Sequence, residues 1–61
     1  MIFEEALKKM REGYEVGLEK GIDDEVFRIN NNEIERLRYD GEWAPIYLDG
    51  EQILSKDWYV R

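Results

Sequence analysis

Most side chains of this chain that could take part in chemistry are carboxylates, ammonium groups or guanidinium groups. Among the 61 residues there is no histidine and no cysteine, so the commonest general base and metal ligand at neutral pH is missing. Ser55 is the only serine. It stands beside Lys56, but adjacent side chains of a strand or helix point apart, which argues against a Ser-Lys nucleophile. We therefore expect a protein that is not an enzyme.

The acidic run Asp23-Asp24-Glu25 offers hard oxygen ligands that suit calcium or magnesium. Its spacing does not match an EF-hand loop, so a solvated acidic turn is the favoured interpretation. Gly13, Gly17 and Gly21 recur every four residues without forming a phosphate-binding motif, and they are interpreted as helix-stop and turn residues. We expect no metal and no cofactor.

The charge of the chain is strongly acidic, with a formal net charge of −6. Two stretches hold most of the acids, Glu12 to Glu25 and Asp40 to Asp57. Gripping nucleic-acid phosphates directly needs clustered Lys and Arg, so nucleic-acid binding is not expected. An acidic surface can instead meet a basic protein surface through complementary potential. The alternative is that the acids only keep a small protein soluble.

Large aromatic rings are numerous for so short a chain, with two Trp, four Tyr and two Phe. They suit either a compact core or a recognition surface. We favour the core for Trp43 and Trp58, and expect Tyr47 and Tyr59 to be partly exposed. The candidate partner-binding residues are Glu15, Glu19, Asp23, Asp24, Glu25, Trp43 and Tyr47.

The first element predicted is an amphipathic helix from Phe3 to the stop at Gly13, because Phe3, Leu7 and Met10 share one face. Alternation then predicts a strand around residues 14–19, which ends at a Lys20-Gly21 turn. A second strand covers residues 25–29 and leads to Asn30-Asn31-Asn32, where asparagine tolerates the left-handed backbone of a hairpin.

The segment from Glu33 to Tyr39 is ambiguous. It is a short helix if Asn32 is an N-cap, and a strand if the asparagines form a hairpin turn; we prefer the strand. Residues 43–48 alternate like a further strand, which Pro45 places at a sheet edge. Asp49, with Gln52 three residues later, predicts the start of a helical turn that runs through Leu54. A last strand contains Trp58 to Val60.

The fold class expected is α+β: one small domain over residues 1–61, with an N-terminal helix on a small antiparallel sheet and a short second helix before the last strand. So small a core favours a homodimer or higher oligomer. The chain has neither a signal-like apolar run nor the roughly 20 apolar residues of a membrane span, so we expect a cytoplasmic protein.

Both ends of the chain resemble a family of small phage and prophage proteins. Ten residues carry this resemblance: Phe3, Glu5, Ala6, Leu7, Gly13, Val16, Leu54, Asp57, Trp58 and Val60. The family includes anti-defence proteins that act on the Thoeris system and a member reported as an anti-CRISPR. Its first strand is typically followed by an Arg-Lys-Gly-Trp run, of which this chain keeps Lys20 and Gly21.

The resemblance implies two functions. One is a phage-type inhibitor of bacterial immunity that binds a host defence effector with its acids and aromatic rings. The other is an oligomeric sponge that sequesters a small nucleotide signal, with its phosphates held by Lys20, Arg28, Arg36 or Arg38. A structural phage accessory protein is a third alternative. The net negative charge favours the first over the second.

Overall fold

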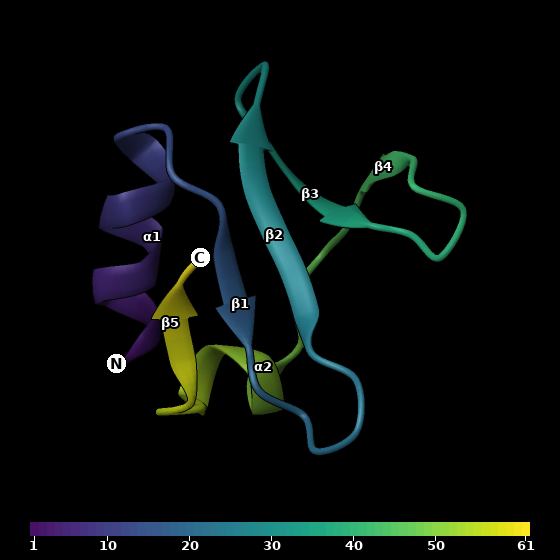
Figure 1. Cartoon of the computed structure of the whole chain (residues 1–61). Helices are drawn as coiled ribbons and strands as arrows, with labels where there is room; N and C mark the ends of the chain where they lie inside the picture. Colours follow the sequence, from purple (N-terminus) through teal and green to yellow (C-terminus); the bar gives the residue numbers. More distant parts are fainter.

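The computed structural model describes residues 1–61 as an α+β structure (Figure 1). The elements in chain order are α1 (Phe3–Arg11), β1 (Val16–Leu18), β2 (Glu25–Asn30), β3 (Glu33–Leu37), β4 (Trp43–Pro45), α2 (Gly50–Leu54) and β5 (Trp58–Val60). All five strands form one antiparallel sheet in the order β4-β3-β2-β1-β5. The predicted architecture is therefore confirmed: an N-terminal helix, an antiparallel sheet, and a short helix before the last strand.

Helix α1 forms because one stripe of its surface is apolar and its charges suit its dipole. Ala6 and Met10 are fully buried against the sheet. Acidic residues occupy the first turn and basic residues the last, which places each charge near the helix end of opposite sign. Gly13 then adopts a φ of 98°, a left-handed conformation that ends the helix as predicted.

The asparagine run makes a hairpin turn and not a helix cap. Asn31 and Asn32 take φ values of 52° and 63°, which asparagine tolerates better than most residues. The chain therefore reverses into β3, and the predicted strand is confirmed.

Strand β4 lies at the sheet edge, as Pro45 predicted, but the strand expected over residues 43–48 ends at Pro45. The Ile46 N–H still donates to the Ile34 carbonyl at 3.0 Å. Beyond it the chain leaves the sheet to reach α2, which explains why the alternation of residues 46–48 does not continue the strand.

Helix α2 has the predicted cap. The Asp49 carboxylate accepts from the Gln52 N–H at 2.9 Å, and the Gln52 side chain accepts from the Asp49 N–H at 2.9 Å. The Gln52 carbonyl accepts from the Trp58 indole N–H at 2.9 Å, so this turn of helix fixes the start of β5.

The core lies between α1 and the inner face of β1, β2 and β5. Trp58 is 1% exposed, and its ring centroid stands 5.4 Å from that of Phe3 and 5.3 Å from that of Phe27. Aromatic pairs at such distances contribute beyond the area they bury. The prediction that the first helix packs on the terminal strand is confirmed, and so is the core position of Trp58.

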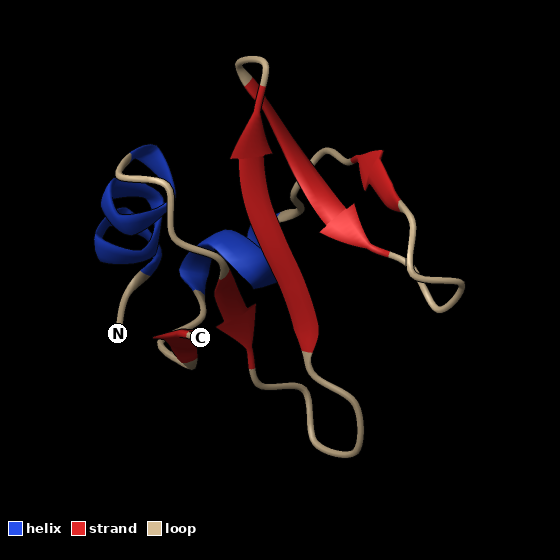
Figure 2. Cartoon of the chain, turned by 45° about the horizontal axis from the view of Figure 1, so that its top comes forward, coloured by secondary structure: helices blue, strands red, loops and turns tan.

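The other face of the sheet carries no helix. α1 packs against β5, β2, β1 and α2, so both helices lie on one side of the strands (Figure 2). Alternate strand residues therefore point to the uncovered side. We call this side the open face; it includes Gly17, Val26, Arg28, Glu35, Leu37, Trp43 and Tyr59.

Neither helix has the length and apolar composition that crossing a membrane requires.

Candidate functional site

Antiparallel connectivity brings three separate connections to one end of the sheet. β1 and β3 finish there, and β2, β4 and β5 begin there, so residues 19–24 lie between residues 38–42 on one side and residues 55–57 on the other. The Glu19 N–H donates to the Asp57 carbonyl at 3.1 Å, which ties the first connection to the last. The two acidic stretches of the sequence thus meet in space.

Five exposed acids at this end make no ion pair. Two cations there also make none: Lys56, and the N-terminal ammonium of Met1, which donates to the Lys56 and Trp58 carbonyls at 3.1 and 2.7 Å. We call these five acids the acidic end; they are Glu19, Asp23, Asp24, Glu42 and Asp57. Like charges gathered in this way produce a negative potential that extends beyond the surface.

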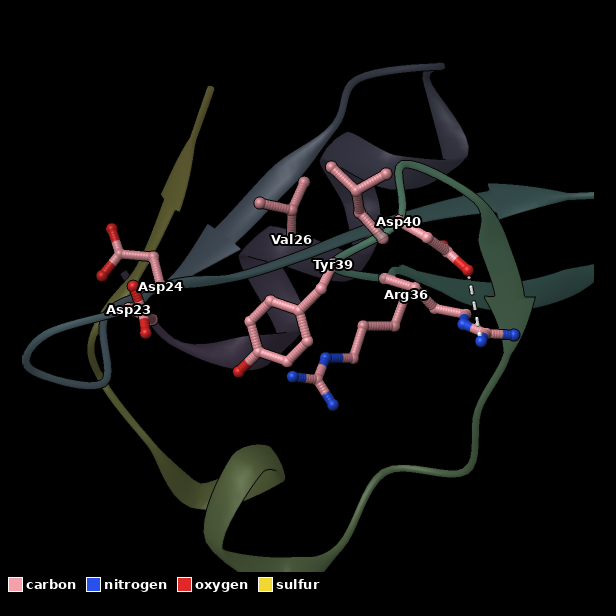
Figure 3. A pocket seen from close by; sticks show the side chains of 8 residues that line it. Asp23, Asp24, Val26, Arg36, Tyr39 and Asp40 are labelled. Carbon is pink, nitrogen blue, oxygen red and sulfur yellow. Dashed lines mark ion pairs between the residues drawn. The ribbon is translucent and has the colours of Figure 1, made fainter.

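A cleft of about 560 Å³ opens at the same end (Figure 3). Asp23 and Asp24 stand on one side, and Arg36 and Asp40 on the other. Val26 and Leu37 contribute its apolar lining, and the ring of Tyr39 lies between the two sides with 94% of its surface exposed. The cleft therefore combines carboxylates, guanidinium groups and an aromatic ring.

The four cations predicted to hold phosphate do not form one cluster. Each of them already faces a carboxylate, with Lys20 and Arg36 on Glu25, Arg28 on Glu35, and Arg38 on Asp40. Arg36 and Arg38 line the cleft, while Arg28 belongs to the open face. An incoming phosphate would have to compete with a carboxylate for each of these cations.

Glu25 is not one of the outward-facing acids. Only 12% of its side chain is exposed, and it lies 3.8 Å from the Lys20 ammonium and 3.3 Å from Arg36 Nε. It also accepts from the Gln52 amide at 3.2 Å. Glu25 thus links β2, β3 and α2, so we withdraw it from the predicted partner-binding set.

The ring of Tyr59 lies over Gly17, where an added Cβ would come within 2.3 Å of it. Its hydroxyl donates to the Asp24 carboxylate. This hydrogen bond raises the pKa of Tyr59 above its usual value; desolvation and the negative charge of Asp24 act in the same direction, and Arg61 opposes them. Tyr59 is therefore a neutral donor at physiological pH, fixed beside the acidic end.

Trp43 is half-buried on the open face and not in the core, which corrects its expected position. It pairs across strands with Leu37, and the Arg28 guanidinium lies 4.3 Å from its ring centroid. Arg28 Nε also donates to Glu35 at 2.9 Å. Stacking and an ion pair thus fix both side chains, and part of the Trp43 ring stays exposed.

Two further predicted residues lie elsewhere. Glu15 is at the opposite end of the sheet, where it faces Arg61 at 3.3 Å. Tyr47 follows β4 and is fully exposed, which is more than the partial exposure predicted. Of the predicted partner-binding acids, Glu19, Asp23 and Asp24 are thus the ones brought together.

Sequence reasoning missed several residues of this site, among them Tyr39, Asp40, Glu42 and Asp57. The signal that could have found them is topological. Alternate connections of an antiparallel sheet lie at the same end, so the turns at Lys20-Gly21 and Asp40-Gly41 had to be neighbours.

No family model matches this chain, and neither the curated proteins nor the solved structures include a significant match to it.

Proposed function

We propose that this chain is a non-enzymatic inhibitor of the phage type, whose acidic end and open face bind a basic surface of a bacterial defence effector. The observation that carries the proposal is the gathering of acids from both acidic stretches at one end of the sheet. Five of these carboxylates have no cation of their own, so their charge is available to a partner.

Charge of this kind mainly speeds and orients the encounter between two proteins. Lasting affinity depends more on a few large side chains that are desolvated on binding. The open face and the cleft supply three such rings, Trp43, Tyr59 and Tyr39, and the first two are already fixed by neighbours. The proposed division of roles is therefore steering by the acids and anchoring by the rings.

The nucleotide sponge is the second candidate, and one observation favours it. Arg36 and Arg38 line the same cleft as Tyr39, which could combine phosphate binding with base stacking. Asp23, Asp24 and Asp40 line this cleft too, so a phosphate would bind against a negative local field. We therefore rank the protein inhibitor first.

The effector hypothesis is tested by mixing the purified chain with a basic Cas effector and its guide at low salt. Co-elution and reduced target cleavage are the expected results, and both should weaken as salt is raised. The triple variant Glu19→Gln, Asp23→Asn, Asp57→Asn should bind roughly tenfold more weakly, since about 1.4 kcal/mol corresponds to a factor of ten. None of these three side chains makes a hydrogen bond or ion pair within the chain.

A matched control removes three acids elsewhere, with Glu4→Gln, Glu33→Gln and Glu51→Gln. Both triple variants carry a net charge of −3, that is −6 plus three, so only the position of the lost charge differs. The control should bind like the original chain. Equal losses in the two variants would show that net charge alone matters, and absence of co-elution would refute the effector hypothesis.

The sponge is tested separately by thermal unfolding in the presence of cyclic ADP-ribose-type nucleotides. A ligand at about 100 times its dissociation constant stabilises the folded state by about 2.7 kcal/mol. An unchanged melting temperature at that excess of nucleotide would argue strongly against this second candidate.

A further inference from the structure

The helix side of the sheet has an apolar groove that α1 leaves uncovered. Five strands spaced about 4.8 Å apart span roughly 19 Å from the first strand to the last, whereas one helix is about 10 Å wide. α1 packs over β5, β1 and β2, and the β3–β4 hairpin extends away from it (Figure 1). The groove has two adjoining parts of about 450 and 300 Å³. Its apolar lining comes mainly from Phe3, Leu7, Ile34, Ile46, Leu48 and Ile53, and its polar rim from Arg11, Asn32 and Glu33.

Tyr47 and Leu48, which follow Ile46 after β4, line this groove and have no backbone partner. The Ile46 N–H points to β3, so the next backbone N–H, that of Tyr47, points away from it. Neither Tyr47 nor Leu48 donates or accepts a backbone hydrogen bond. Tyr47 lines the groove and is fully exposed.

Together with β4, this segment forms the longest uncharged run of the chain. Charged residues make up 39% of the sequence, yet the six residues Trp43 to Leu48 include none. Two chains that each carry a charge of −6 repel each other least where such runs meet. In a two-fold symmetric dimer, the same surface patch of both subunits forms the interface, so the patch must be complementary to itself. The groove and the exposed segment beside it meet this requirement, because the segment of one copy can fill the groove of the other.

We propose that a second copy of this chain docks on the groove about a two-fold axis that passes beside Tyr47. The Tyr47–Leu48 segment of each copy then packs into the groove of the other. The unpaired N–H and C=O of Tyr47 form reciprocal hydrogen bonds across the axis.

Pairing along this segment stops after one pair of hydrogen bonds. Pro45 has no N–H to donate, and the Asp49 N–H is already held by the Gln52 side chain at 2.9 Å. At the other edge of the sheet, the Trp58 N–H donates to the Met1 carbonyl at 3.2 Å, which occupies the start of β5. The association therefore closes as a dimer and does not extend into a continuous sheet.

Sedimentation of the purified chain between about 10 μM and 1 mM tests the proposal. A concentration-dependent shift toward twice the 7.4 kDa chain mass is expected. Tyr47→Asp places two like charges near the axis and should weaken association at least tenfold. Tyr39→Asp is the matched control, because Tyr39 is 94% exposed at the far end of the sheet, and it should leave association unchanged.

A second measurement uses the absence of cysteine from the chain. Under mild oxidation, Tyr47→Cys should form a disulfide-linked dimer at least tenfold faster than Tyr39→Cys, since bridged Cα atoms must lie within about 7 Å. Circular dichroism checks that each variant is folded. A chain that stays monomeric up to 1 mM would overturn the proposal, and so would equal rates for the two cysteine variants.

Discussion

Each face of the sheet carries one tryptophan, and the two are held by different forces. Trp58 lies on the helix side, 1% exposed, in contact with the rings of Phe3 and Phe27 and with its indole N–H bonded to Gln52. Trp43 lies half-buried on the open face beneath the Arg28 guanidinium. Shape complementarity holds the first ring, and charge holds the second.

This difference separates stability from recognition. Side chains packed among apolar neighbours cannot change without leaving a cavity. Side chains held by stacking and ion pairs keep one surface toward solvent, where a partner can reach them. The open face is therefore the side on which substitutions should alter binding more than folding.

Replacement of each tryptophan is the strongest test of this contrast. Trp58→Ala should cost about 3–5 kcal/mol, because it removes the largest buried side chain. A domain of this size has a total stability of only about 3–9 kcal/mol, so much of the variant should be unfolded at 25 °C. Trp43→Ala, the matched variant, should cost about 1 kcal/mol through lost stacking.

Urea denaturation followed by circular dichroism measures both variants. Similar losses of unfolding free energy would mean that the open face is as much a core as the helix side, and the proposed separation of stability from recognition would not hold.

Gly17→Ala should have the next largest effect, because the added Cβ meets the Tyr59 ring at 2.3 Å. The ring must swing away and give up its hydrogen bond to Asp24, at a cost of about 1–2 kcal/mol. In a Tyr59→Ala background the same substitution should be nearly neutral. The four unfolding free energies form a double-mutant cycle. Additive effects would show that contact with the Tyr59 ring is not what makes Gly17→Ala destabilising.

The ionisation of Tyr59 tests the coupling between the open face and the acidic end. Its pKa is raised, so the proton is bound more tightly in the folded state than in the unfolded one. The hydrogen bond to Asp24 therefore stabilises the fold fully below pH 10, and this contribution is lost as pH rises from 10 through the raised pKa.

Absorbance at alkaline pH follows tyrosine ionisation, and subtraction of a Tyr59→Phe titration isolates Tyr59 from the other three tyrosines. Asp24→Asn should lower the pKa of Tyr59, whereas Asp23→Asn should change it little. If Asp24→Asn leaves the titration of Tyr59 unchanged, the hydrogen bond does not control its pKa.

The fold was predictable because local signals agreed with one another. Gly13, the asparagine run and the Asp49 cap each set a boundary through backbone preferences that depend on few neighbours. The residue at which β4 ends was not predictable. Residues 46–48 alternate like a strand, but the need to reach α2 takes them out of the sheet, and no local pattern records that need.

The site was predictable only in part, because charge patterns do not say which acids find partners. Glu19, Asp23 and Asp24 lie where an acidic surface was expected. Glu25, next in sequence, turns inward because strand alternation places it opposite Leu18 on the helix side. The position of Trp43 could not be inferred either, since the side of the sheet that lacked a helix was not known from the sequence.

The smallest effect is expected from the ion pair that orients Arg28 over Trp43. Glu35→Gln removes the charge that Arg28 Nε contacts at 2.9 Å and should cost about 1 kcal/mol or less, because Arg28 is partly exposed. The cost should shrink in 1 M salt, where the screening length falls to about 3 Å. Glu33→Gln, on the same strand but without an ion pair, should change the unfolding free energy by less than about 0.5 kcal/mol at either salt concentration. Equal, salt-independent losses in the two variants would show that Trp43 is held by packing, and the contrast between the two tryptophans would then be one of degree.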